Sequence, residues 1–187
     1  SGRPRAMSAQ APQRVLIALG ANVAPRADLP EAVARLAAAP DVRLIAVSRV
    51  WRTRAVGAPG PDYLNAAVAL DTPLDPDALR ERVLRPIEAA LGRVRGPDRN
   101  APRPIDLDIA AVGALLDPER GIPDPEIPAR PHLALPLADI APGWREPRTG
   151  LPLARLAARL AEEPGIALDP LDLPGPRGTV DGRDPSP

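Results

Sequence analysis

The chain has 187 residues, its 24 basic and 24 acidic side chains give a formal net charge of zero, and 44% of it is hydrophobic. It holds no Cys, one His (His132) and no Lys, since all 24 basic residues are Arg. These counts exclude disulfide scaffolds, zinc fingers, thiol nucleophiles, Schiff-base chemistry and the lysine of a P-loop. Any bound metal is therefore expected to be a hard cation on carboxylates, and any bound phosphate to be held by Arg.

Two segments of biased composition, one at each end of the chain, flank one expected domain. Residues 1–13 are expected to be a disordered tail or a cloning remnant, and residues 164–187, rich in Pro, Gly and Asp, a second disordered tail. Residues 14–163 should then form a single domain. Because no apolar run is long enough to span a membrane and no signal-peptide pattern is present, we expect a cytoplasmic protein.

The first half of the domain alternates strands with a helix. Residues 15–19 are apolar and stop at Gly20, which is typical of a buried strand. The capping-box pattern from Asp28 to Glu31 predicts the start of a helix. Residues 42–53 alternate in hydropathy and predict one long strand, and residues 64–71 predict a third strand after a Pro/Gly-rich loop.

A second helix is expected from the N-cap Asp75 to Gly92, with an irregularity at Pro86, which cannot donate a backbone hydrogen bond. A loop rich in Arg and Pro follows, and residues 105–112 predict the fourth strand. The order of elements predicts an α+β fold with a ferredoxin-like βαββαβ antiparallel sheet. Residues 151–162 predict a C-terminal helical extension packed against it.

The fourth strand carries two acidic residues. In a strand, period-two alternation places Asp106 and Asp108 on one face and Leu107 on the other. Two like charges on one strand face repel each other, and Mg²⁺ bound beside them would remove that conflict. A solvated strand face is the alternative interpretation.

Basic side chains gather just before this strand. Five Arg residues stand between positions 85 and 103, offset by only two acids: Arg85, Arg93, Arg95, Arg99 and Arg103. Arginines beside paired carboxylates suit a complex of a polyphosphate with Mg²⁺. An arginine-solvated helix end and loop would have the same composition. Near the third strand, Asn65 offers both a donor and an acceptor for the edge of a heterocycle, whereas Tyr63 also fits the rim of a core.

Several segments resemble one enzyme family when they are taken in order: ALGAN (18–22), YLNAAV (63–68), IE-x3-GRVR (87–95), APR-x2-DLDI (101–109) and LPL-x2-IAP (135–142). Together they are similar to the 6-hydroxymethyl-7,8-dihydropterin pyrophosphokinases of the folate pathway. The resemblance implies a ferredoxin-like fold with α/β/α layers. It also implies transfer of pyrophosphate from ATP to the hydroxymethyl oxygen of the pterin, with release of AMP.

The resemblance also implies roles for individual residues. Asp106 and Asp108 would bind two Mg²⁺ ions, and Arg93 and Arg103 would hold the transferring phosphates. The ATP side would be formed by Glu88, Arg95, Arg99, Ile109, Asp124 and Arg130. The pterin would be bound by Thr53, Val56, Tyr63, Asn65 and His132.

Three positions depart from the family pattern. Asp124 stands where a His is usual, Asn100 where a loop Trp is frequent, and His132 where a Phe usually stacks on the ring. Such changes fit the same activity, a relative acting on another pterin, or a non-catalytic pterin- or nucleotide-binding module. A ferredoxin-like RNA-binding module is a further alternative, but the chain lacks the exposed aromatic residues that stack on bases. We expect small-molecule substrates, no nucleic-acid or membrane partner, and a monomer or weak dimer.

Overall fold

The computed structural model describes residues 10–55, 59–92 and 105–181. Its sheet contains β1 (Gln13–Ala21), β2 (Arg43–Val47), β3 (Val50–Thr53), β4 (Tyr63–Thr72), β5 (Asp106–Val112) and β6 (Ala167–Asp169). The helices are α1 (Pro25–Ala38), α2 (Pro76–Leu79), the π-helical turn η1 (Arg80–Leu84), α3 (Arg85–Ala90), α4 (Pro131–Ile140) and α5 (Leu153–Leu160).

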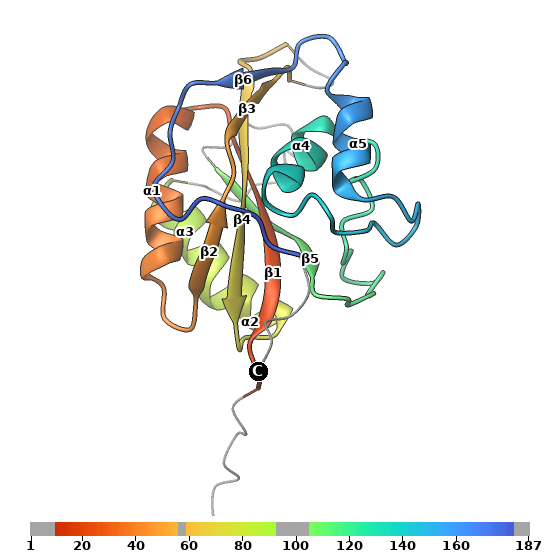
Figure 1. The fold of residues 1–187 in the computed structure, drawn as a ribbon. Helices are drawn as coiled ribbons and strands as arrows, with labels where there is room; N and C mark the ends of the chain where they lie inside the picture. The colour runs from red at the N-terminus through yellow and green to blue at the C-terminus, as the bar shows by residue number, and fades with distance from the viewer. Residues whose placement is uncertain (1–9, 56–58, 93–104, 182–187) are drawn as a thin grey trace, which may run out of the picture.

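The sheet order is β5-β1-β4-β3-β6, and β2 also pairs with β4. All of these pairings are antiparallel. Since β2 and β3 share the place beside β4, the order confirms the expected ferredoxin-like βαββαβ sheet. Helices α1 and α3 lie on one side of the sheet, and α4 and α5 lie on the other (Figure 1). This arrangement agrees with the α/β/α layers that the resemblance implied.

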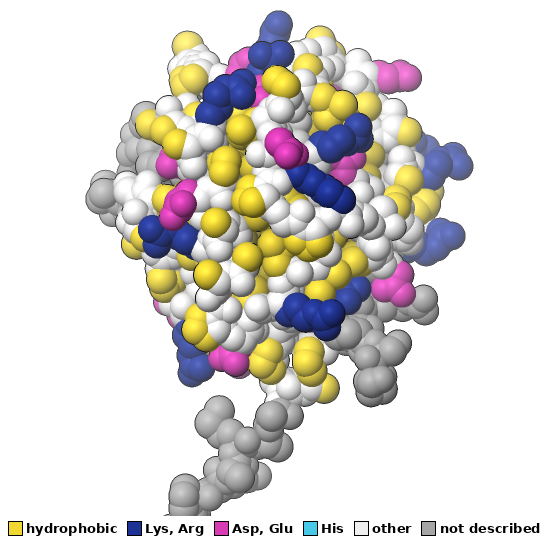
Figure 2. Space-filling model, turned by 60° about the vertical axis from the view of Figure 1, so that its left-hand side comes forward, with side chains coloured by type: hydrophobic (Ala, Val, Ile, Leu, Met, Phe, Trp, Pro, Cys, Tyr) yellow, Lys and Arg dark blue, Asp and Glu magenta, His cyan; other side chains and the backbone are white. Residues whose placement is uncertain are grey.

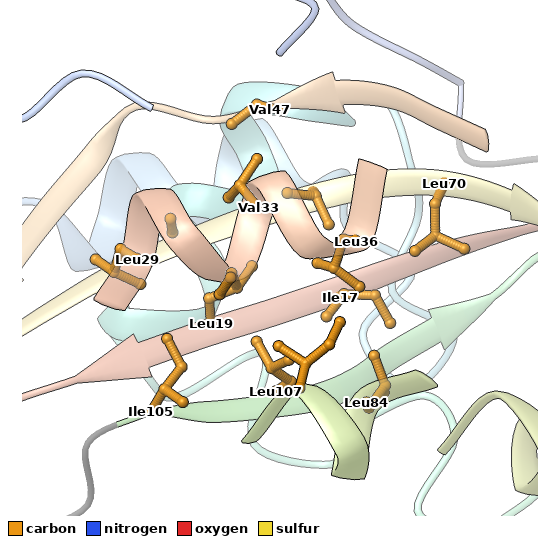
Figure 3. Close-up of a cluster of buried hydrophobic side chains, with 14 of the residues drawn as sticks. Ile17, Leu19, Leu29, Val33, Leu36, Val47, Leu70, Leu84, Ile105 and Leu107 are labelled. Carbon is orange, nitrogen blue, oxygen red and sulfur yellow. The ribbon is translucent and has the colours of Figure 1, made fainter. Parts of the chain in front are cut away.

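Each face of the sheet has its own apolar cluster. On the α1 side, Leu29, Val33 and Leu36 of the helix belong to one cluster with Ile17 of β1 and Leu107 of β5. Leu36 lies beside Ile17 (Figure 3). The helix buries these leucines and the valine because they recur every three or four residues. The second cluster, under α4 and α5, is built largely from Ala and Leu, since the chain offers few aromatic residues.

Two predicted boundaries differ from the structure. Helix α1 begins at Pro25 with Ala24 as its N-cap, so Asp28 lies in the first turn and the predicted start was wrong. Proline fits the first helical position because its missing N–H has no partner there. The single strand expected over residues 42–53 is interrupted at Ser48, whose Oγ accepts a hydrogen bond from Ala67 N at 2.8 Å and thereby replaces a backbone partner.

The second helix follows its predicted course. Asp75 is the N-cap, and its carboxylate accepts a hydrogen bond from Ala78 N at 2.8 Å. Just before Pro86 the helix widens into η1, where Arg85 N bonds to Arg80 O, five residues back. The expected irregularity is therefore present as a π turn. It shifts the backbone hydrogen bonds just before Pro86, which has no N–H to donate.

The prediction of a disordered tail over residues 164–187 was wrong for residues 164–181. Strand β6 pairs with β3, and the segment after it runs past α1 and crosses β2 (Figure 1). Leu173 is buried in the first cluster, and Val180 N donates to Ile140 O of α4 at 2.7 Å. We call residues 165–181 the C-terminal strap. The expected tail of residues 1–13 is also too long by one, because Gln13 already belongs to β1.

An ion pair fastens the strap to α1. Arg26 of α1 donates two hydrogen bonds, of 3.0 and 2.8 Å, to the buried carboxylate of Asp169. Burial alone would raise the pKa of Asp169, but the hydrogen bonds from Arg26 and from Leu171 N outweigh it and hold the pKa below its ordinary value. The strap's composition predicted disorder, yet a few well-placed apolar and acidic residues are enough to dock it.

Candidate active site

A cavity of about 310 Å³ opens on the side of the sheet that α4 covers. Its lining comes from four strands, the loop before α4 and the start of α4: Ala18, Leu19, Gly20, Thr53, Arg54, Tyr63, Asn65, Asp106, Asp108, Asp124, Glu126, His132 and Leu133. A volume of this size is at the lower end of the range for small-molecule sites.

The two acidic residues of β5 lie in this cavity together. Asp106 is half-buried and Asp108 is exposed, while Ile105, Leu107 and Ile109 are buried on the opposite face. The prediction that the two carboxylates share one face is therefore confirmed. Their oxygens are the ligands that Mg²⁺ prefers. Among the described residues that line the cavity, the other side chains able to bind a metal are the carboxylates of Asp124 and Glu126 and the imidazole of His132.

The cavity exists because β1 carries small residues on this face. Gly20 pairs with Asn65 of β4 on one side and with Asp106 of β5 on the other, and Ala18 is in the same way flanked by Ala67 and Asp108. A Cβ atom added at Gly20 would lie 3.4 Å from Asn65 Oδ1. A larger side chain in the middle strand would fill the space between the amide and the carboxylates.

The amide group of Asn65 has a fixed orientation. Its Nδ2 donates to Thr53 Oγ1 at 2.9 Å and to Trp51 O at 3.2 Å. Both amide hydrogens are therefore used within the protein, and Oδ1 remains on the Gly20 side to accept a hydrogen bond from a ligand. The hydroxyl of Thr53, which accepts from Asn65, can still donate. The pair thus presents one acceptor and one donor to the cavity.

His132 enters the cavity from the first turn of α4, directly after Pro131. Burial lowers its pKa below the ordinary value; Glu126 and Asp124 act to raise it and Arg130 acts to lower it. The ring is therefore neutral at pH 7 and can face an uncharged aromatic ligand.

Helix α4 is fixed to β3 at its other end. Asp139 accepts hydrogen bonds from Trp51 Nε1 at 3.0 Å and from the Arg49 guanidinium at 2.6 Å. The Arg49 guanidinium also lies 5.2 Å from the centre of the Trp51 ring. Sequence analysis missed α4 altogether, because its two prolines and its nearly continuous apolar run obscure the helical pattern.

A buried glutamate supports the position of Asp124. Glu146 is fully buried and accepts from Arg148 Nε at 2.6 Å and from Thr149 N at 2.8 Å. Arg148 in turn donates to Asp124 O at 2.8 Å, while the Asp124 carboxylate accepts from Glu126 N. Burial alone would raise the pKa of Glu146, but these bonds from Arg148 and Thr149 hold it below its ordinary value. The site therefore receives a third carboxylate with a fixed backbone.

The remaining predicted site residues lie elsewhere. Arg130 does not line the cavity but pairs, at 3.6 Å, with Glu126, which does. Glu88 of α3 and Ile109 of β5 are buried on the α1 side of the sheet and do not line the cavity. Six positions named in the sequence analysis fall outside the described residues: Val56, Arg93, Arg95, Arg99, Asn100 and Arg103.

Sequence analysis also overlooked residues that line the cavity. Gly20 and Ala18 belong to a quoted motif, and the small size of both on one strand face was the available signal. Arg54 and Glu126 stand in Pro-rich stretches whose course a sequence pattern does not give. Within residues 10–55, 59–92 and 105–181 no three His, Asp or Glu side chains are grouped closely enough to form a metal site by themselves.

Comparison with known proteins agrees with this geometry. The sequence model of 7,8-dihydro-6-hydroxymethylpterin-pyrophosphokinase (HPPK) matches residues 16–142. The chain belongs to this family. Relatives named 2-amino-4-hydroxy-6-hydroxymethyldihydropteridine pyrophosphokinase include one from Methylorubrum extorquens, 45% identical over 69% of this chain and 83% of the relative. Another, from Synechocystis, is 38% identical over 75% of this chain and 73% of the relative.

Solved structures agree on the fold. A Plasmodium falciparum HPPK-DHPS structure superposes with a TM-score of 0.63 at 13% identity, covering 86% of this chain. The chain spans 49% of that longer protein. At 13% identity the likeness shows a shared fold. In the described part of the chain, no helix has the length and apolar character needed to cross a membrane.

Proposed function

We propose that this protein transfers pyrophosphate from ATP to the hydroxymethyl group of 6-hydroxymethyl-7,8-dihydropterin and releases AMP. The observation that carries the proposal is the meeting of Asp106 and Asp108 with Thr53, Asn65 and His132 in one cavity. The resemblance assigned the two aspartates to the metal and the other three residues to the pterin. The names of the relatives support the same reaction.

The chain's own residues bind and orient the acceptor. Asn65 Oδ1 accepts a hydrogen bond from an N–H group of the pterin, and the Thr53 hydroxyl donates one to it. The neutral ring of His132 stacks on the heterocycle. These contacts hold the hydroxymethyl oxygen toward the side of the cavity where Asp106 and Asp108 lie.

The two aspartates fit the metal that the reaction needs. Asp106 and Asp108 would hold Mg²⁺, two ions in the proposal, which neutralises charge on the phosphates of ATP. The hydroxymethyl oxygen releases its proton to solvent and attacks the β-phosphorus. The bond from that phosphorus to the oxygen of the α-phosphate breaks, and AMP leaves with that oxygen. Arg93 and Arg103 are proposed to hold the transferring phosphates, and Glu88, Arg95, Arg99, Ile109, Asp124 and Arg130 the ATP side. No covalent nucleophile is required, because positioning and charge neutralisation dominate such transfers.

We propose small-molecule substrates and no nucleic-acid partner. On the face drawn in Figure 2, basic and acidic side chains are interspersed. We further propose a cytoplasmic location. We also propose a monomer or weak dimer, and light scattering measures this oligomeric state.

The test is AMP formation from ATP and Mg²⁺ with 6-hydroxymethyl-7,8-dihydropterin as acceptor. The proposal requires AMP to appear together with the pterin diphosphate in equal amounts, and only when acceptor is present. A second pterin with a different side chain at C6 tests the alternative of a related acceptor. Binding of both ligands without AMP would establish a non-catalytic module instead.

A further inference from the structure

Arg54 gives the cavity a positive charge that the proposed function does not use. It follows Thr53 at the end of β3 and lines the cavity together with Asp106, Asp108, Asp124 and Glu126. Across residues 10–55, 59–92 and 105–181, Arg54 makes no hydrogen bond and no ion pair. A guanidinium beside four carboxylates that pairs with none of them has its donors available to a ligand.

Gly165, the first residue of the C-terminal strap, lies against the Arg54 side chain. Gly165 has a φ of +85°, and a Cβ atom built there would be 2.7 Å from Arg54 Nε and 2.8 Å from its Cδ. No other residue could take this position without moving the arginine. Two residues later the strap enters β6, where Ala167 pairs with Arg52 of β3. The strap is therefore paired with the strand that ends just before Arg54.

We propose that Arg54 is a specificity-determining residue that donates hydrogen bonds to an acceptor oxygen of the ligand, and that Gly165 is the positioning residue that directs it. The inference rests on the proposed function. Arg54 would add hydrogen-bond donors to the part of the cavity where the Asn65 side chain presents only an acceptor. The planar guanidinium suits an oxygen with two lone pairs, which either the carbonyl oxygen attached to the pterin ring or an oxygen of the diphosphate supplies.

Binding measurements on an arginine variant test the first part. Arg54→Met keeps the length of the side chain and removes its donors. Arg52→Met, two residues earlier in β3, is the matched control. The probes are 6-hydroxymethylpterin alone and inorganic pyrophosphate with Mg²⁺, each titrated separately by calorimetry. We expect Arg54→Met to weaken one of them by about tenfold or more, as loss of a charge-assisted hydrogen bond does, and Arg52→Met to change neither. The affected probe identifies the source of the oxygen; less than twofold change in both overturns the inference.

A pair of glycine variants tests the second part. Gly165→Ala and Gly178→Ala both place a Cβ atom in the strap at positive φ, but the one at Gly178 meets nothing within 4 Å. Gly165→Ala should weaken the probe that responds to Arg54→Met, while Gly178→Ala should not. Equal effects of the two variants would show that general loosening of the strap, and not the position of Arg54, is responsible. The AMP assay separates the two proposals, because a protein that makes AMP but binds both probes equally well after Arg54→Met refutes this inference alone.

Discussion

The loss of stability caused by truncating Leu173 tests how tightly the C-terminal strap is packed against the domain. Its side chain is 2% exposed and packs into the cluster beneath α1. Leu173→Ala removes the burial of most of an aliphatic side chain and leaves a cavity, a combination that costs about 2–5 kcal/mol in well-packed cores. Because the strap is a single segment that can partly collapse onto the space, we expect about 3 kcal/mol. For a chain of this length that corresponds to a fall in Tm of about 6–12 °C.

Leu168→Ala is the matched control. It makes the same substitution in the same strap, but the Leu168 side chain is 45% exposed. Urea unfolding followed by far-ultraviolet circular dichroism gives both free energies, and the control should change by no more than about 0.5 kcal/mol. A loss below about 0.5 kcal/mol for Leu173→Ala, with an unchanged m-value, would refute the packing of the strap.

Three further predictions concern the site. Asp106→Asn or Asp108→Asn should lower the rate of AMP formation at least about 100-fold. Pterin affinity measured without Mg²⁺ should change less than about threefold. Equal losses in both measurements would contradict a metal role. Since the pKa of Glu146 lies below its ordinary value in the folded state, its contribution to stability is present above about pH 4.5 and is lost as the pH falls through the folded pKa. Arg148→Ala should therefore move the midpoint of acid unfolding to higher pH, and an unchanged midpoint would rule out the pairing. For His132, burial lowers the pKa, so pterin affinity should change only below about pH 6.5, and His132→Phe should abolish that dependence; parallel profiles would place the ring outside the binding site.

The fold could be predicted where a local pattern has one structural meaning. The alternation of β5 placed Asp106 and Asp108 correctly, and Asp75 before a proline gave the N-cap of α2. The pattern failed where tertiary contacts override it. Pro136 lies inside α4, where neighbouring elements bury the helix on nearly all sides, so neither proline content nor amphipathicity marked it.

The site could be predicted only in part for a similar reason. Residues on strands follow from periodicity, as Asn65 and Asp108 do. Arg54 is different, because its place depends on Gly165, more than a hundred positions later in the sequence. Glu146 fixes the backbone of Asp124 through Arg148, although it lies 22 positions later in the sequence. No spacing rule connects such pairs, since they meet through the packing of loops.

The short strand β6 also protects the protein from self-association. Without it, the outer edge of β3 would expose free N–H and C=O groups, which can pair with a strand of another molecule. Strand β6 covers that edge. Its own outer edge exposes few backbone groups for pairing, because it is three residues long and is followed by Pro170, which has no N–H to donate. The strap that orients a residue of the cavity thus also terminates the sheet, so damage to its docking should reduce solubility as well as ligand binding.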